Sequence, residues 1–382
     1  MKRMAVGIMS GTSLDGIDVC LAQVEGTSKE TQVEILAFET YPMEDNLKGL
    51  IKEAMHPSTC TPALMSSLNM MLGYTFGDAV VKLCSSYGIQ SEELDFVASH
   101  GQTIWHINED DGLYVKSSLQ LGDGAAIAAK VKTTVITNFR TADIAAGGVG
   151  APLVPYVDYL LFSDDHKHRS LHNLGGISNM TVLQKGGREE DMIAFDTGPA
   201  NLMMDRAMMV LYGKAYDQDG QIASSGKKIP ELHRLLMSHP YLNEKPPKST
   251  GRELFGDAYT DEILHLFQHE KKEDIMYTLT MFTKDSIVKA YQDFILNHIK
   301  LDEIIFSGGG AYNQFLLEEM KKSMPDINIL KLEDIGFDSK AKEALAFLIL
   351  GNETINHKPS NLLKATGAKR KAILGQIQYY LK

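Results

Sequence analysis

The sequence predicts a duplicated α/β fold, and three features of its pattern indicate this. Strand-like apolar segments at residues 3–11 and 16–26 flank a polar glycine turn, which predicts a hairpin. Residues 170–184 repeat the order of strand, glycine turn and strand. A strand, a glycine-rich loop and a helix follow one another over residues 302–324. The pattern alone leaves open that the likeness of the two hairpins is due to chance.

The other elements of the first half follow in order along the chain. Residues 31–41 predict a third strand. Residues 62–87 predict a helix, because Leu64, Leu68 and Leu72 recur at helical spacing. We then expect a buried strand that ends in a polar loop at residues 94–101 and a further strand at residues 133–139. A helix is expected at residues 152–162, after its prolines.

The second half alternates strands and helices in a similar way. After its hairpin we expect a strand running into a loop at residues 190–201 and a helix at residues 202–213. A further strand is expected at residues 327–335 and a last helix at residues 339–351. The proline- and glycine-containing segment at residues 246–254 is the best candidate for a mobile loop.

Length, charge and cysteine content narrow the class of protein. A chain of 382 residues favours two domains. The net charge of −11 argues against nucleic acid as a partner, because binding a phosphate backbone requires a basic face. Cys20, Cys60 and Cys84 lack CxxC spacing, so we expect buried structural thiols in a reducing compartment. No signal peptide and no apolar run of ~18 residues is found, which favours a soluble cytoplasmic protein without membrane contact.

The turn GTSLDGID at residues 11–18 carries an apparent contradiction. Its glycines, Thr12 and Ser13 suit a phosphate, because small residues allow the backbone to approach closely and hydroxyls donate hydrogen bonds. Asp15 and Asp18 would repel that phosphate, unless Mg²⁺ accompanies it and bridges carboxylate and phosphate oxygens. An ordinary Asp-Gly hairpin turn is the alternative. The GxxxxGK[ST] pattern of a P-loop is absent.

Two further stretches carry candidate site residues. Asp196, in AFDTGPAN, is placed at the end of an apolar strand, where a carboxylate could act as a general base; capping of the following helix or turn is the alternative. Gly308, Gly309 and Gly310, in FSGGGAYN, would allow close contact with a flat or anionic ligand. A tight strand-to-helix turn explains these glycines equally well.

Histidines and an arginine mark two more stretches. His100 and His106, in SHGQTIWH, lack a convincing third metal ligand, so we interpret them as hydrogen-bonded loop residues. Arg140 lies beside Asp143 and a glycine-rich turn. It could bind a substrate carboxylate through two parallel hydrogen bonds, although a surface ion pair is the commoner role of such an arginine.

Together these stretches resemble one family, the anhydro-N-acetylmuramic acid kinases of bacterial cell-wall recycling. The resemblance runs in order from residue 9 to residue 368 and so covers essentially the whole chain. The matching segments are MSGTSLDGID, SHGQTIWH, LGDGAAIA, NFRTADIAAGGVGAPLVP, NLGGISNMT, FDTGPANLMMD, YDQDGQIA, PPKSTGRELF, SGGGAYN and ATGA.

The resemblance implies a fold and a set of domains. The family belongs to the actin, hexokinase and chaperone-ATPase superfamily, whose two RNase H-like α/β domains enclose a nucleotide in an interdomain cleft. We therefore expect one domain at residues 1–140 and another at residues 141–364, with residues 365–382 packing back onto the first. A homodimer is also expected from the family, and the helix at residues 62–87 is a candidate for its interface.

The resemblance also assigns roles to individual residues. Asp196 would be the catalytic base, and Arg140 and Glu343 would contact the sugar. Gly308, Gly309 and Gly310 would border the adenosine of ATP. The residues that would hold the ATP phosphates, with Mg²⁺ near Asp15 and Asp18, are Gly11, Thr12, Ser13, Leu14, Asp15, Gly16, Ile17 and Asp18.

The activity that the resemblance implies joins two events. Water opens the 1,6-anhydro bridge of 1,6-anhydro-N-acetylmuramic acid, and ATP phosphorylates O6, giving N-acetylmuramic acid 6-phosphate and ADP. A glycoside hydrolase uses a second carboxylic acid to protonate the leaving oxygen; here the γ-phosphoryl group captures O6 instead. Two alternatives remain at this point: a kinase of an unbridged amino sugar, and a nucleotide-dependent binding or chaperone-like module.

Overall fold

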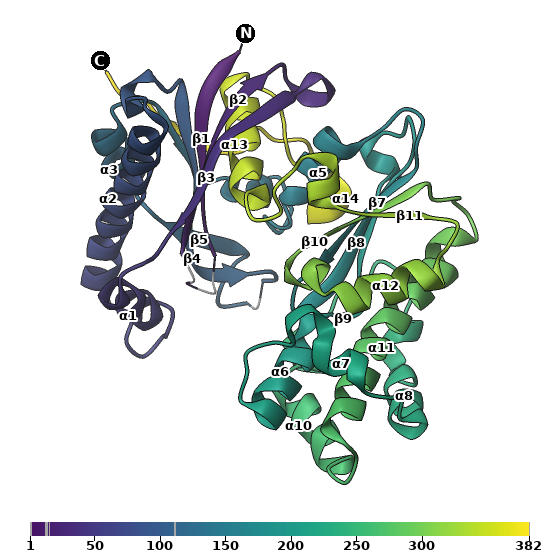
Figure 1. Ribbon diagram of the computed structural model, residues 1–382. Coiled ribbons are helices and arrows are strands. Elements are labelled where there is room, and N and C mark those ends of the chain that lie inside the picture. Colours follow the sequence, from purple (N-terminus) through teal and green to yellow (C-terminus); the bar gives the residue numbers. More distant parts are fainter. Residues whose placement is uncertain (1, 12–13, 15, 111, 382) are drawn as a thin grey trace. The chain divides into compact units, whose positions relative to one another are not determined.

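The computed structural model describes residues 2–11, 14, 16–110 and 112–381, which form two compact units (Figure 1). Unit 1 comprises Met1–Leu161 with Lys340–Lys382, and unit 2 comprises Phe162–Ser339. These limits differ from the expected domain boundaries at residues 140 and 364. At the second boundary the reason lies in α13 (Lys342–Ile355), which packs against strands of the first sheet and so joins unit 1.

Unit 1 is built around a seven-stranded sheet. Its strand order is β12-β6-β4-β1-β2-β3, and β5 pairs with β4 beside this path. β1 pairs antiparallel with β2, and β2 with β3, whereas β4 is parallel to both β1 and β6. The strands are β1 (Arg3–Ser10), β2 (Ile17–Glu25), β3 (Gln32–Tyr41), β4 (Phe96–Ile107), β5 (Ser117–Leu121), β6 (Val135–Thr137) and β12 (Gln376–Gln378).

Helices cover both faces of this sheet. Figure 1 shows α2 and α3 on one face and α13 on the other. α2 spans residues 62–87, as predicted, because Thr61 caps its first turn through a bond from the amide of Leu64 and Gly88 ends it with a φ of 84°. The helices of unit 1 are α1 (Asp45–Ala54), α2 (Pro62–Tyr87), α3 (Gly124–Val131), α4 (Thr141–Ala145), α5 (Val154–Phe162), α13 and α14 (Leu363–Thr366).

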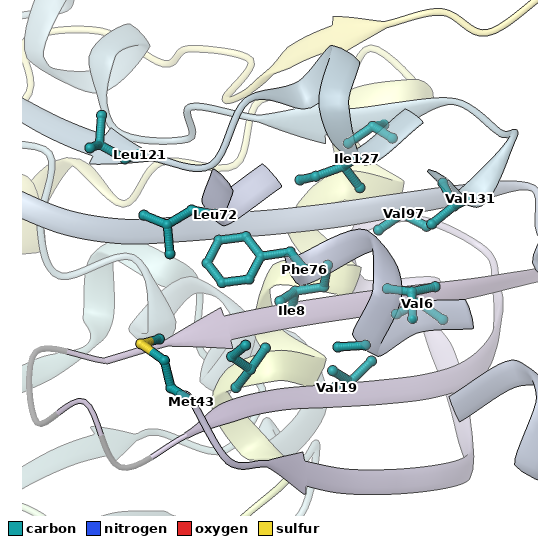
Figure 2. Packing of buried hydrophobic residues seen from close by; sticks show 14 of the residues in the cluster. Val6, Ile8, Val19, Met43, Leu72, Phe76, Val97, Leu121, Ile127 and Val131 are labelled. Carbon is teal, nitrogen blue, oxygen red and sulfur yellow. The ribbon is translucent and has the colours of Figure 1, made fainter. Parts of the chain in front are cut away.

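The core of unit 1 lies between the sheet and α2. Figure 2 shows the Phe76 ring of α2 close to Ile8 of β1, with Leu72 beside it. These side chains are fully buried. Truncating such an aromatic side chain to alanine typically costs about 3–5 kcal/mol of stability. The sheet that carries the candidate phosphate turn is therefore rigidly supported from this side.

On the opposite face, α13 approaches β1 unusually closely. A Cβ atom at Gly7 would lie 1.9 Å from the carbonyl oxygen of Ala344. Any side chain at Gly7 would push α13 away from β1. This contact fixes the first turn of α13, which carries Glu343, relative to the sheet.

Unit 2 repeats the sheet topology of unit 1. Its five strands are ordered β11-β10-β7-β8-β9, with β7, β8 and β9 antiparallel and β10 parallel to β7 and β11. Because order and direction match β6-β4-β1-β2-β3, the predicted duplicated α/β fold with two RNase H-like domains is confirmed. The strands are β7 (Arg169–Leu174), β8 (Ile177–Leu183), β9 (Ile193–Pro199), β10 (Glu303–Ser307) and β11 (Asn328–Lys331).

The helices of unit 2 pack around the long helix α11. It contacts β9 and also α6, α7, α8 and α12. Its buried side chains, among them Phe282 and Tyr291, belong to two apolar clusters, one against the sheet and one among the helices. The helices are α6 (Asn201–Tyr212), α7 (Gln221–Ser225), α8 (Pro230–Met237), α9 (Arg252–Phe255), α10 (Asp257–Leu266), α11 (Lys272–Tyr291) and α12 (Gln314–Ser323).

Several local predictions were wrong. SHGQTIWH is not a loop, because β4 continues to Ile107 by pairing with β5. Asp196 does not end its strand: β9 runs on to Pro199 across a register shift in its pairing with β8. The chain after Lys331 turns into a short 3₁₀ helix rather than remaining a strand. Cys20 and Cys84 are buried as expected, but Cys60 is exposed.

Candidate functional site

As predicted, β1 and β2 form a hairpin. Met9 pairs with Asp18, and the amide of Leu14 donates to the carbonyl of Gly11 over 3.3 Å. Leu14 has a φ of 58°, so it provides the left-handed backbone of this turn. Gly16 is required by packing, because a Cβ there would lie 2.6 Å from Cγ2 of Thr40. Thr12, Ser13 and Asp15 lie outside the described residues.

A buried glutamine on β4 supports the start of this turn. Ser10 Oγ donates to Gln102 Oε1 over 2.6 Å, and Gln102 Nε2 donates to the carbonyl of Gly11 over 3.3 Å. Both Ser10 and Gln102 are buried. The amide side chain therefore fixes the backbone at the point where the candidate phosphate-binding segment begins. This role of Gln102 has no local signal in the sequence, since it depends on the parallel pairing of β1 with β4.

Glu343 of unit 1 lies within electrostatic range of two other predicted site residues, Asp18 and Arg140. Asp18 Oδ1 accepts a hydrogen bond from Thr40 Oγ1 over 2.6 Å. The Glu343 side chain reaches solvent but is largely surrounded by protein; this desolvation, and then the charge of Asp18, raises its pKa. Arg140 and Lys342 act in the opposite direction on the pKa of Glu343. Glu343 is thus influenced by both Asp18 and Arg140, residues predicted from segments far apart in the sequence.

Arg140 does not form a surface ion pair, although the sequence left this open as the commoner role of such an arginine. Its Nε and Nη2 atoms donate to Nε2 of His100 over 3.1 and 2.8 Å, and its Nη1 donates to the carbonyl of Gly150 over 2.7 Å. Desolvation lowers the pKa of the guanidinium, while the charge of Glu343 raises it. Arginine remains charged in proteins in such surroundings. Arg140 is therefore a fixed positive charge held mainly by neutral acceptors.

Asp143 has a structural role beside Arg140. Its Oδ2 accepts from the amide of Gly150 over 2.9 Å, and its Oδ1 accepts from Asn361 Nδ2 and Thr366 Oγ1 over 2.9 and 2.7 Å. Asp143 is fully buried. The carboxylate joins the glycine-rich segment after Arg140 to the C-terminal part of unit 1, and its hydrogen-bonding capacity is used within the protein.

A buried ion pair supports the beginning of α13. Asp158 on α5 is buried and lies 3.0 Å from Nζ of Lys342, the residue before Glu343. Burial raises the pKa of Asp158, and the Lys342 ammonium opposes that rise. Removing one partner of a buried pair is strongly destabilising. This pair therefore helps to fix the turn of α13 that carries Glu343.

In unit 2, hydrogen bonds with Tyr241, Lys248 and Thr250 hold Asp196 in place. The amide of Asp196 donates to the carbonyl of Lys248 over 3.1 Å, and the amide of Thr250 donates to Asp196 Oδ2 over 2.9 Å. Tyr241 Oη donates to the carbonyl of Asp196 over 2.8 Å. Within the described part of the chain, Oδ1 of Asp196 makes no hydrogen bond, so one carboxylate oxygen is available.

The electrostatics of Asp196 suit a base. Desolvation by burial raises its pKa, the Thr250 amide lowers it, and the charge of Glu253 raises it. A carboxylate with a raised pKa accepts a proton more readily than one in water. Capping of the next helix, the alternative from the sequence, does not occur, because α6 has no side-chain cap.

Lys248 anchors the segment that holds Asp196. Its side chain is 8% exposed, and its Nζ donates to the carbonyl of Tyr241 over 3.0 Å. The ammonium also lies over the rings of Tyr241 and Phe294, at 4.5 and 5.2 Å from the ring centres. Sequence analysis noted this segment only as a candidate mobile loop. A lysine between prolines and small residues gave no signal of such burial.

The three glycines after β10 are explained partly by packing. Gly308 has a φ of 80°, and a Cβ there would lie 2.6 Å from Asn173 Oδ1. A Cβ at Gly310 would lie 2.7 Å from Asn201 Oδ1. At Gly309 the nearest atom to such a Cβ, Asn201 Nδ2, is 3.6 Å away. The tight-turn interpretation thus accounts for Gly308 and Gly310, whereas a Cβ at Gly309 would make only an ordinary van der Waals contact.

Two searches over the described residues bear on the class of site. No helix among them is both long enough and apolar enough to cross a bilayer. The same residues contain no group of three or more His, Cys, Asp or Glu side chains arranged to hold a metal ion. A divalent cation at Asp18 would consequently depend on oxygen ligands from outside these side chains as well.

Comparisons with known proteins show the family to which the chain belongs. A family model described as anhydro-N-acetylmuramic acid kinase matches residues 3–380. A protein of that name from Francisella tularensis subsp. novicida (strain U112) is 51% identical over 378 residues, covering 99% of both chains. Another, from Bacillus thuringiensis subsp. konkukian (strain 97-27), is 47% identical over 376 residues, covering 98% of both.

Solved structures of other proteins match the chain more distantly. The (R)-2-hydroxyglutaryl-CoA dehydratase component A of Acidaminococcus fermentans is 10% identical and covers 91% of this chain and 96% of its own, with a TM-score of 0.43. A ROK hexokinase from Thermus thermophilus is 11% identical, with 92% and 99% coverage and a TM-score of 0.36. These scores are too low to support a conclusion about the site. The family model and the close relatives suffice: the chain belongs to the anhydro-N-acetylmuramic acid kinase family.

Proposed function

We propose that this protein is an ATP-dependent kinase that opens the 1,6-anhydro bridge of 1,6-anhydro-N-acetylmuramic acid and phosphorylates O6, in the recycling of peptidoglycan. The names of its close relatives support this function, and they do not favour either alternative. The structural observation that carries the proposal is Asp196, a carboxylate of raised pKa that is oriented by a backbone amide and retains an available oxygen.

In the proposed reaction, Asp196 removes a proton from the water that attacks the anomeric carbon. The bond between this carbon and O6 breaks as the bond between water oxygen and carbon forms. O6 then takes the γ-phosphoryl group of ATP, and ADP leaves. Because O6 is captured by phosphorus, no second carboxylic acid is needed to protonate it, in contrast to an ordinary glycoside hydrolase.

The sugar contacts are proposed for Arg140 and Glu343 of unit 1. Arg140 brings a positive charge fixed by His100 and Gly150. Glu343, with its raised pKa, is suited to exchange hydrogen bonds with sugar hydroxyls. These roles follow from the family resemblance, and the mutual electrostatic influence of the two side chains supports them.

The ATP contacts are proposed for residues 11–18 and for the glycines of residues 308–310. The turn between β1 and β2 is held at its base by Gln102, which suits a preformed phosphate site. Two neighbouring carboxyl groups, Asp18 and Glu343, are an environment that a hard divalent cation stabilises. Asp18 would hold Mg²⁺ together with ATP phosphates, and the ion would neutralise phosphate charge.

A homodimer in the cytoplasm completes the proposal. The exposed side chains of Met70, Met71 and Tyr74 lie on α2, the helix proposed for the interface. Their exposure is compatible with such an interface. Light scattering at several protein concentrations measures the oligomeric state, and a monomer at all of them would contradict the dimer.

The decisive test uses ¹⁸O-labelled water. The pure protein is incubated with Mg²⁺, ATP and 1,6-anhydro-N-acetylmuramic acid, and the product is analysed by mass spectrometry at early times. We expect a 6-phosphorylated sugar carrying ¹⁸O at the anomeric position. A reaction of unlabelled N-acetylmuramic acid in the same water corrects for anomeric exchange. Absence of a phosphorylated product, while ATP still binds, would refute the proposed function.

A further inference from the structure

We infer that His100, as a neutral hydrogen-bond acceptor, is the positioning residue that orients the Arg140 guanidinium toward the sugar. The inference rests on the proposed sugar-binding role of Arg140. It concerns a histidine that the sequence marked only as a hydrogen-bonded polar residue and that the proposed reaction does not otherwise use.

The hydrogen bonds define the tautomer of His100. Its Nδ1 lies 2.8 Å from the carbonyl oxygen of Gly101, which can only accept, so Nδ1 carries the proton. Its Nε2 lies 2.8 and 3.1 Å from Nη2 and Nε of Arg140, which can only donate. Nε2 is therefore the unprotonated nitrogen. It accepts from both Nε and Nη2, the two nitrogens on one side of the guanidinium.

Burial keeps this histidine neutral. The side chain is 3% exposed, and its ring packs against Phe347 with 4.6 Å between ring centres. Burial, and then the charge of Arg140, lowers the pKa of His100 to about 3. A protonated ring would also place an N–H group against the N–H groups of Arg140. His100 thus accepts from Arg140 over the whole physiological pH range.

A neutral partner has a consequence that a carboxylate partner would not have. It fixes the orientation of the guanidinium without cancelling its charge. Among the described residues, His100 and Gly150 use three of the five N–H groups, which leaves one on each terminal nitrogen. Arg140 can therefore present two donors and its charge to an oxygen-rich or anionic group of the sugar.

The other end of Arg140 is fixed through the backbone. Gly150 accepts from Nη1 of Arg140, and its own amide donates to the buried carboxylate of Asp143. Gly150 has a φ of 73°, and a Cβ there would lie 3.2 Å from the Cβ of Arg140. On the other side, Phe347 connects the His100 ring to α13, the helix of Glu343. His100 thus contacts both Arg140 and the helix that carries Glu343.

The experiment compares two substitutions of His100. His100→Met removes the acceptor but keeps an apolar side chain of similar size, whereas His100→Gln retains an oxygen near the position of Nε2. We expect His100→Met to raise KM for the anhydro sugar about 10- to 100-fold, as for loss of hydrogen bonds to a charged group. KM for ATP stays the same, and His100→Gln restores most of the sugar affinity. An unchanged KM for the sugar in His100→Met would overturn the inference.

Two controls separate positioning from a general loss of stability. His172→Met removes another buried neutral histidine, in unit 2, whose nitrogens bond Tyr291 and Ser178. It should lower the melting temperature without raising KM for the sugar. In an Arg140→Met background, the further change His100→Met should have little effect on that KM. Equal effects of His100→Met with and without Arg140 would contradict the positioning role.

One readout does not depend on activity. ¹⁵N NMR of the wild-type protein at neutral pH should show His100 with a protonated Nδ1 and an unprotonated Nε2, and Arg140→Met should change the Nε2 signal. A protonated Nε2 would refute the contact with Arg140. If the wild-type protein does not phosphorylate the anhydro sugar, the proposed function fails, and this measurement still decides whether His100 holds Arg140.

Discussion

Replacing Asp196 by asparagine tests the proposed base while leaving its surroundings intact. Asparagine has the same shape, and its carbonyl oxygen can accept from the Thr250 amide as Oδ2 does now, over 2.9 Å. The backbone bonds of residue 196 with Lys248 and Tyr241 do not involve the side chain. The substitution therefore removes the proton acceptor and little else.

The expected effect on turnover is large. Loss of a general base typically lowers kcat about 10²- to 10⁴-fold. At about 1.4 kcal/mol for each factor of ten, this corresponds to about 3–5.5 kcal/mol of transition-state stabilisation. ATP affinity should remain that of the wild type, because Asp196 is not among the proposed phosphate ligands. The acidic limb of the wild-type pH profile should have its midpoint above the ordinary carboxyl value, since burial raises the pKa of Asp196.

Asp196→Asn should not destabilise the folded protein, in contrast to a substitution that only removes contacts. Because the pKa of Asp196 is raised in the folded state, folding disfavours its ionised form. This unfavourable contribution is present above the folded-state pKa and disappears as the pH falls below it. The asparagine variant lacks it at neutral pH, so its melting temperature should not be lower than that of the wild type. A loss of turnover can then not be attributed to unfolding.

The assay measures ADP release under saturating substrates, with ATP affinity determined separately by calorimetry. Asp205→Asn is the matched control, because Asp205 is another partly buried aspartate of unit 2, whose pKa burial raises to about 6. It lies on α6 and has no proposed role, so its substitution should leave kcat unchanged. Near wild-type turnover of Asp196→Asn, or an equal loss in Asp205→Asn, would refute the assignment of the base.

Two further substitutions test what supports the site. Gly7→Ala should destabilise the protein by about 1–3 kcal/mol or more, because its Cβ would lie 1.9 Å from the carbonyl oxygen of Ala344. The control is Gly49→Ala in α1, where a Cβ would have no atom within 4 Å. Denaturant unfolding should show that this control stabilises the protein by about 0.5–1 kcal/mol. Lys248→Met should lower kcat about tenfold, or about 1.4 kcal/mol, without changing KM for ATP, because it loses the bond to Tyr241 that holds the Asp196 segment. Wild-type kcat in this variant would show that Lys248 serves stability alone.

The elements with local signals could be predicted from the sequence. The helix at residues 62–87 was placed correctly, because Thr61 and Pro62 mark its start and Gly88 its end. The two hairpins were recognised for the same reason, since a glycine turn and its flanking apolar residues lie within one short segment. In both cases the residues that fix the boundary are neighbours in the chain.

The errors occurred where distant residues determine the structure. β4 continues beyond His100 because β5, about 15 residues later, provides its hydrogen-bonding partner. Likewise, Asp196 is held by Thr250, a contact between residues that lie 54 positions apart. Neither pairing has a local pattern, so the sequence indicated the candidate residues but not how they are oriented. His100 was accordingly interpreted as an ordinary polar residue.

The proposed sugar-binding arginine and the proposed catalytic base are held in the same way. Arg140 is fixed by the neutral acceptors of His100 and Gly150, and Asp196 by the backbone amide of Thr250. Within the described chain, neither side chain has an ion-pair partner within 4 Å. An opposite charge in contact would orient each group equally well, but it would also compete with the substrate for that group. Neutral dipoles orient the charge in advance and leave it for the reaction, which is the arrangement that electrostatic catalysis requires.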